Sequence, residues 1–331
     1  MLLRVFKGTS PGVIFLIIIT LLAIWASAFI RLKSHFSLYF DLDPMPLYGI
    51  LSDIIGTKPL PGIIFTLLIV SLMAFLMVNL NTTIFFINER TFLPALIYIL
   101  ISGLFPQYQL LNPAIFAAMF LTLAIRRIVE AYHIQGTAYS FFDAGILIGT
   151  GSLFYANLIW FGLIVIIGIV LLRTGTLKEV VISVIGLITP FMLTFGIYYV
   201  LGKDIKNLLS LLAYNLFGKP TGFSFTPLTA VALTLAGLST LVSIVYLLRL
   251  MNTKKIKSRK TFSLLLWIFF IAIGVYFIVP SVSVEIVWIA GIPVSYFLTH
   301  YFVFIKKRLV PEIFFTLFFI FILVIQIWYM R

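Results

Sequence analysis

Apolar runs of about 20 residues follow one another along almost the whole chain, beginning with the run from Pro11 to Phe29. A helix needs about 20 apolar residues to cross the hydrocarbon core of a bilayer. Because lipid cannot satisfy backbone polar groups, successive runs of this kind fold as helices. Charged residues make up 10% of the 331 residues, against about 25% in a typical soluble domain. The sequence therefore predicts an all-α, polytopic transmembrane protein with no separate soluble domain.

Eleven spans are predicted from these runs, within a single transmembrane domain that covers residues 1–331. They lie near 12–30, 61–80, 92–105, 113–126, 140–153, 155–172, 179–201, 225–250, 261–280, 284–304 and 312–330. The spans 92–105, 113–126 and 140–153 are shorter than a full crossing. We expect these three to be tilted, extended into the interface or paired as re-entrant hairpins.

The net charge of +13 is distributed in short basic clusters between the apolar runs. A nucleic-acid-binding protein instead gathers its basic residues on one solvated face. We therefore expect no nucleic-acid partner, and we interpret the clusters as signals that orient the chain in a membrane.

A cytoplasmic N-terminus followed by eleven crossings places sixteen of the 23 basic residues in the cytoplasm. That side then includes the dense clusters at 254–260 and 306–308. The external side holds Arg31, Lys33, Lys58, Lys203, Lys206, Lys219 and Arg331. This excess agrees with the positive-inside rule, so the sequence predicts that the N-terminus is cytoplasmic.

Two connections are long, 31–60 and 202–224, and both fall on the external side. The second contains Ile205, Leu208, Leu209, Leu212 and Leu216, whose spacing is typical of an amphipathic helix. Such a helix over 203–217 is expected to lie in the plane of the membrane. The alternating pattern of 45–56 predicts a second interfacial helix in the first connection.

The carboxylates of Asp41 and Asp43 stand two residues apart on the predicted external face. In an extended segment both point the same way, so the pair could share a divalent cation. Alternatively, one of them acts as a general base on an acceptor hydroxyl. The remaining alternative is that both are solvated loop residues.

Glu285, at the outer end of a late span, either faces an aqueous cavity or is a hydrated helix-start residue.

Basic side chains on the external side, where few are expected, suggest a binding site for a lipid phosphate. Arg31, Lys203 and Lys206 are the candidates for this role. The alternative is ordinary contact with lipid headgroups through snorkelling side chains. The chain has no cysteine, which excludes disulfides, thiol nucleophiles and thiolate metal sites.

Residues 91–201 resemble the membrane core of the GT-C superfamily, the polyprenyl-linked glycosyltransferases. The likeness rests on TFLPALIYILISGLFPQYQLLNPAIFAAMFLTLAI at 91–125, on FFDAGILIGTGSLFYANLIWFGLIVIIGIVLLR at 141–173 and on the span at 178–201. The order of elements is also similar, because an external loop bearing acidic residues follows the first span. The resemblance covers the first 201 residues as a GT-C-like core, followed by the external amphipathic segment 202–224 and the C-terminal helices of 225–331.

This resemblance implies a transferase that uses a polyprenyl-phosphate-linked sugar at the outer leaflet of the cell inner membrane. Asp41 and Asp43 would serve the acceptor or metal site, while Arg31, Lys203 and Lys206 would hold the lipid phosphate. The chain departs from the superfamily because the loop lacks an acidic cluster near an arginine and no large external domain follows.

Three alternatives stay open. The chain also resembles uncharacterised polytopic inner-membrane proteins of bacteria, and it could be a GT-C relative that has lost catalysis. It could be a non-catalytic component of an envelope assembly or secretion complex, with other envelope membrane proteins and membrane lipids as its partners. The last alternative is a transporter or lipid flippase, although few ionisable residues fall within the spans.

Overall fold

The computed structural model describes residues 2–31, 43–55, 59–133, 138–172, 177–218, 226–305 and 309–330. These residues form helices joined by short connections, and no strand occurs among them. The α-helices are α1 (Leu2–Phe6), α2 (Pro11–Ile30), α3 (Pro46–Ile55), α4 (Pro59–Ile84), α5 (Leu93–Ser102), α6 (Pro113–Glu130), α7 (Ala138–Ser152), α8 (Leu163–Leu172), α9 (Leu177–Val200), α10 (Ile205–Phe217), α11 (Pro227–Leu250), α12 (Ile256–Ile278), α13 (Val287–Phe304) and α14 (Leu309–Met330). The 3₁₀ helices are η1 (Pro106–Tyr108), η2 (Ala131–His133), η3 (Ala156–Gly162), η4 (Met251–Thr253) and η5 (Val284–Ile286). The predicted all-α class is confirmed.

Within the described residues, seven helical segments are long and apolar enough to cross a membrane. They are built on α2, α4, α9, α11, α12, α13 and α14. The other four predicted spans are also helical but fall short of this standard. Helices α5 and α7 are short, the span predicted at 155–172 divides into η3 and α8, and α6 carries Arg126, Arg127 and Glu130 in its last turns. The chain is thus a multi-pass membrane protein, while the count of eleven crossings stays a prediction.

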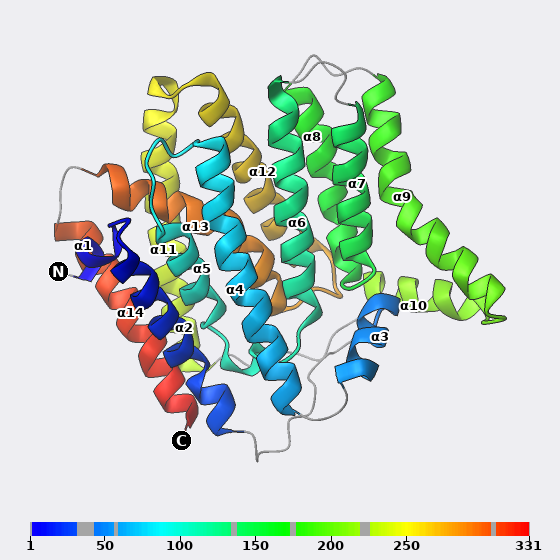
Figure 1. Ribbon diagram of the computed structural model, residues 1–331, viewed down its shortest axis with the longest axis horizontal. Coiled ribbons are helices and arrows are strands. Elements are labelled where there is room, and N and C mark those ends of the chain that lie inside the picture. Colours follow the sequence, from blue (N-terminus) through cyan, green and yellow to red (C-terminus); the bar gives the residue numbers. More distant parts are fainter. Residues whose placement is uncertain are drawn as a thin grey trace.

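The helices run alternately between two ends of the bundle (Figure 1). At one end, which we call the base, Arg31 after α2 lies over the ring of Tyr329 in α14, and α3 and α10 run across the helix ends. At the other end, the lysine side chains bridge between elements: Lys260 of α12 donates to the carbonyl of Leu172 at 3.3 Å, and Lys7 donates to that of Val303 at 2.8 Å. We call this second end the basic end.

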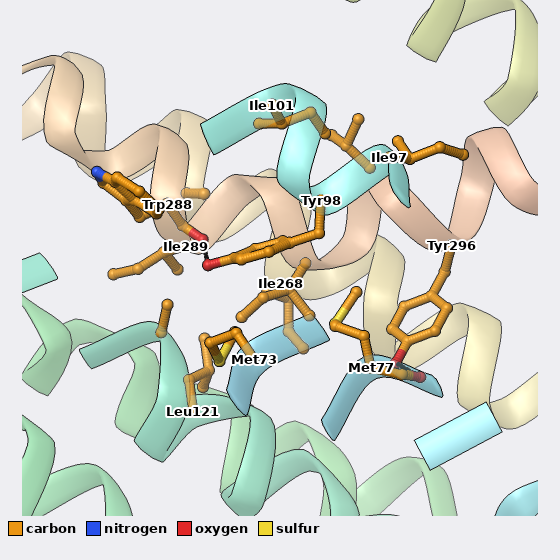
Figure 2. Close-up of a cluster of buried hydrophobic side chains, with 14 of the residues drawn as sticks. Met73, Met77, Ile97, Tyr98, Ile101, Leu121, Ile268, Trp288, Ile289 and Tyr296 are labelled. Carbon is orange, nitrogen blue, oxygen red and sulfur yellow. Dashed lines mark hydrogen bonds between the residues drawn. The ribbon is translucent and has the colours of Figure 1, made fainter. Parts of the chain in front are cut away.

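Helices α5 and α13 form the centre of the bundle. Every residue of α5 is buried, and its ten residues span about 15 Å, too short to cross a bilayer. This short helix is tolerated because α2, α4 and α13 surround it, so the irregular backbone that follows faces protein and not lipid. Figure 2 shows how its side chains interdigitate with those of α4 and α13. The Tyr98 hydroxyl donates to the Trp288 carbonyl at 3.1 Å, which satisfies a polar group in this apolar core.

Helices α7 and α9 pack backbone against backbone because glycines line their contact. A Cβ atom added at Gly145 would lie 2.4 Å from the carbonyl oxygen of Ser183, and one at Gly186 would lie 2.4 Å from that of Phe142. Beyond Pro190 the contact ends: α9 turns away from the bundle (Figure 1), and none of residues 191–200 is buried. The inner half of α9 is therefore clamped, while its outer half projects from the bundle.

Candidate functional site

Interruptions of the helices bring polar side chains together at the base. Helix α12 ends at Ile278, just before Pro280, and α6 begins at Pro113 after Asn112, whose side-chain oxygen accepts the Ala114 N–H at 2.8 Å. Pro280 cannot continue α12, because proline has no backbone N–H to donate within a helix. The backbone carbonyls at the end of α12 therefore need other partners. The side chains that gather around η1, η3 and η5 are Tyr108, Tyr155, Asn157, Asn215, Ser281, Ser283 and Glu285. We call this set the polar layer.

Two asparagines form one half of the polar layer. Asn157 of η3 donates to the carbonyl of Asn215 in α10 at 3.3 Å and accepts a hydrogen bond from the Ser281 hydroxyl at 3.2 Å. Asn215 in turn donates to the carbonyl of Asp43 at 3.0 Å. All but Asp43 are buried, so each of these polar groups depends on its partners. This half of the layer ties the start of α3, the end of α10 and the segment after α12 together.

Glu285 is the carboxylate of the other half. Its Oε1 accepts the Tyr155 hydroxyl at 3.2 Å and the backbone N–H of Ser283 at 3.4 Å. The Tyr108 hydroxyl lies 3.4 Å from that of Ser283. Burial, and after it the charge of Glu285, raise the pKa of Tyr155 well above its ordinary value. Tyr155 therefore stays a hydrogen-bond donor to the carboxylate over the whole physiological pH range.

Of the two predicted catalytic carboxylates, Asp41 lies outside the described residues, and Asp43 is exposed at the base. The backbone near Asp43 is held firmly, because the Leu47 N–H donates to the Leu153 carbonyl at 3.1 Å and the Tyr48 hydroxyl to that of Leu111 at 2.9 Å. The structure thus brings Asp43 to the rim of the polar layer.

The predicted phosphate-binding residues lie apart from one another. The Arg31 guanidinium stands 4.3 Å from the centre of the Tyr329 ring, where α2 and α14 end. Figure 1 shows this corner and α10 on opposite sides of the base. Lys203 and Lys206 are exposed at the start of α10, and the Lys203 ammonium is 5.4 Å from the centre of the Tyr198 ring. Arg31 is therefore separated from the two lysines, which stand at the end of α10 opposite to Asn215.

The sequence leaves open a divalent cation shared by Asp41 and Asp43 as one of several alternatives. Across the part of the chain that the structure describes, no three His, Cys, Asp or Glu side chains gather as ligands for a metal ion. The pair itself includes Asp41, so this site is not described as a whole and stays a prediction.

The asparagines and tyrosines of the polar layer were not predicted from the sequence. Asn157 and Asn215 each stand within an apolar run. They are 58 residues apart in the sequence, so neither run indicates that the two side chains meet. Hydropathy marks each run as apolar without indicating which runs meet. A lone asparagine in an otherwise apolar run was the available signal.

These features define the class of the protein, a polytopic, all-helical membrane protein with a hydrogen-bonded polar layer at one end of its bundle. More particularly, the chain belongs to DUF6427, a family of unknown function whose model matches residues 53–331. The match begins within α3 and includes the polar layer, but it leaves out Asp43. No curated protein and no solved structure matches the chain.

Proposed function

We propose that this chain is a membrane transferase that uses a lipid-linked sugar at the base, which faces the outer leaflet. In this reaction a hydroxyl of the acceptor attacks the anomeric carbon of the sugar, and the bond to the phosphate oxygen of the lipid breaks. The lipid phosphate leaves with the bonding electrons, and a carboxylate takes the hydroxyl proton as general base.

One observation carries the proposal. Asn215 of α10 donates a hydrogen bond to the backbone of Asp43, so the two long external connections meet at the polar layer. The proposed reaction needs a carboxylate as general base, and Asp43 supplies one at the rim of the polar layer. Glu285 supplies a second carboxylate within the layer.

The residues then divide into three roles. Asp43 is the general base, or a cation ligand together with Asp41. Glu285, oriented by Tyr155, positions the acceptor. Lys203 and Lys206 attract the lipid phosphate to α10 by charge. Arg31, on the far side of the base, has no part in this arrangement.

The experiment is turnover of polyprenyl-phosphate-linked hexose by membrane vesicles that contain the wild-type protein or one variant. Asp43→Asn keeps the shape of the side chain and removes its basicity, so the rate should fall by about 10²-fold or more. The matched control is Asp53→Asn, since Asp53 is an exposed acidic residue of α3 in the same region. Its rate should equal that of the wild type. Equal rates for all three proteins would remove Asp43 from the mechanism.

A second candidate function, a component of an envelope assembly, is favoured by the outer half of α9. Residues 191–200 are partly or fully exposed on every side of the helix, and they include Met192, Leu193, Ile197 and Tyr199. An apolar helix that leaves its own bundle is well placed to pack against another membrane protein. A photo-crosslinking residue at Ile197 should then capture one defined protein, whereas the same residue at Phe270 of α12 should not. Lipid adducts alone at both positions would speak against this function.

A further inference from the structure

A small crevice lies between α4 and α6, far from the polar layer. It is lined by Leu76, Asn79, Leu80, Thr122, Leu123 and Arg126. The two helices lie side by side in Figure 1, and the lining residues belong to the last three turns of each helix, toward the basic end. The crevice therefore lies near one end of two apolar helices and not at their middle.

The lining is divided by polarity. Leu76, Leu80 and Leu123 supply an apolar wall, and Asn79 and Arg126 supply the polar part. The Asn79 side-chain oxygen accepts the Thr83 hydroxyl at 2.8 Å, which leaves its amide N–H groups as donors. A ligand that fits this lining is apolar at one end and accepts hydrogen bonds at the other.

Arg126 is the positively charged residue of the crevice. Its Nε–H donates to Glu130 at 2.7 Å, and the guanidinium side chain is 39% exposed. This bond holds the guanidinium in place and, among the described residues, leaves its two terminal amino groups for another acceptor. Two parallel N–H groups of this kind match the oxygens of a phosphate.

We propose that the crevice binds a glycerophospholipid, with its phosphate on Arg126 and the start of one acyl chain against the three leucines. The site is independent of the transferase proposal, because it lies at the opposite end of the bundle. It would fix a lipid of the basic-end leaflet between α4 and α6 and thereby stabilise their contact.

The experiment measures the melting temperature of the purified protein in detergent against added ligand. The ligands are a short-chain phosphatidylglycerol, the diacylglycerol with the same chains, and inorganic phosphate. The phospholipid should raise the melting temperature in a saturable way, since a ligand that binds the native state stabilises it. The other two ligands should have no such effect. An equal effect of diacylglycerol or of inorganic phosphate would overturn the assignment of an intact phospholipid.

Variants locate the binding. Arg126→Gln should weaken the apparent affinity about tenfold, the change expected for the loss of a charged hydrogen bond. Arg249→Gln is the control, because it removes an exposed basic residue from the same end of the bundle but outside the crevice. This control should bind as the wild type does. Leu123→Trp fills the crevice without a change of charge and should abolish binding. Unchanged affinity in both Arg126→Gln and Leu123→Trp, or an equal loss in Arg249→Gln, would refute the site.

Discussion

Single glycines decide how closely α9 approaches α7. At Gly186 the space for a side chain is already occupied by the backbone of Phe142, while at Gly196, ten residues further along the same helix, nothing lies within 4 Å of a Cβ atom. The difference follows from the departure of α9 beyond Pro190 (Figure 1). A pattern of small residues alone would not distinguish the two positions.

Gly186→Ala should therefore destabilise the protein by about 1–3 kcal/mol, because the backbone of α7 must move to admit a methyl group. Gly196→Ala, the control on the same helix, should be neutral or stabilising by up to about 1 kcal/mol, the helix-propensity gain. Unfolding of both variants in detergent checks this prediction. Similar losses at the two positions would contradict the packing described here.

Tyr155 gives the polar layer a dependence on pH. In the folded protein its pKa is raised by burial and by Glu285, so above about pH 10 the unfolded chain loses this proton first. The contribution of Tyr155 to the free energy of unfolding is therefore fully present below that pH and is lost as the pH rises above it.

The free energy of unfolding should accordingly fall as the pH rises above about pH 10, and it should fall less in Tyr155→Phe, which has no proton to lose at this position. At neutral pH the same variant should be destabilised by about 1 kcal/mol through loss of the hydrogen bond to Glu285. Denaturant titrations at several pH values measure both effects. A slope with pH that is identical in the two proteins would show that Tyr155 ionises equally in both states.

At the scale of elements, α3 and α10 were predicted well. The patterns at 45–56 and 203–217 indicated helices, and the structure has α3 at Pro46–Ile55 and α10 at Ile205–Phe217. The start of α10 follows from Asp204, whose side chain accepts the Lys206 N–H at 2.9 Å as an N-cap. Such signals are local, so the sequence contains them in full.

The position of α5 could not be predicted in the same way. Its residues are apolar on every side, as are those of helices that face lipid, and hydropathy does not distinguish a protein neighbour from a lipid neighbour. The burial of the whole helix depends on the preceding helix α4 and on α13, which contacts it from the other end of the chain. For the same reason the sequence did not indicate which side chains form the polar layer.

Helix α10 should be held to the bundle mainly through Asn215. Asn215→Leu removes its hydrogen bonds to the carbonyls of Asp43 and Leu211. Backbone amides in α10 and at 43–55 should then exchange with solvent about tenfold faster. This factor corresponds to a loss of about 1.4 kcal/mol in the free energy of local opening. Asn207→Leu, at an exposed position of the same helix, should leave exchange nearly unchanged. Hydrogen exchange followed by mass spectrometry resolves these peptides. Equal rates in Asn215→Leu and the wild type would mean that other contacts hold α10.

For the whole molecule, the two ends of the bundle differ in charge. Among the described basic residues, the base has Arg31, Lys203 and Lys206, and the others lie at or near the basic end. Such an asymmetry favours a basic end in the cytoplasm and an external base, the orientation on which the proposed function depends.

Cysteine labelling tests this orientation cleanly, because the chain has no cysteine of its own. In intact cells, a maleimide that cannot cross membranes should label Lys206→Cys at the base. It should label Arg249→Cys at the basic end only after the membrane has been permeabilised. The reverse pattern would place the polar layer on the cytoplasmic side of the membrane and would contradict an outer-leaflet reaction.

The central claim, that the polar layer is a transferase site, is tested most directly with purified protein in liposomes that contain polyprenyl-phosphate-linked hexose. The measured quantity is the release of free polyprenyl phosphate in the presence of acceptor sugars. We expect release well above that of protein-free liposomes, and a rate lower by about 10²-fold in Glu285→Gln, which keeps the shape of the side chain but not its charge. Release no faster than in protein-free liposomes, or equal rates for Glu285→Gln and the wild type, would contradict the claim.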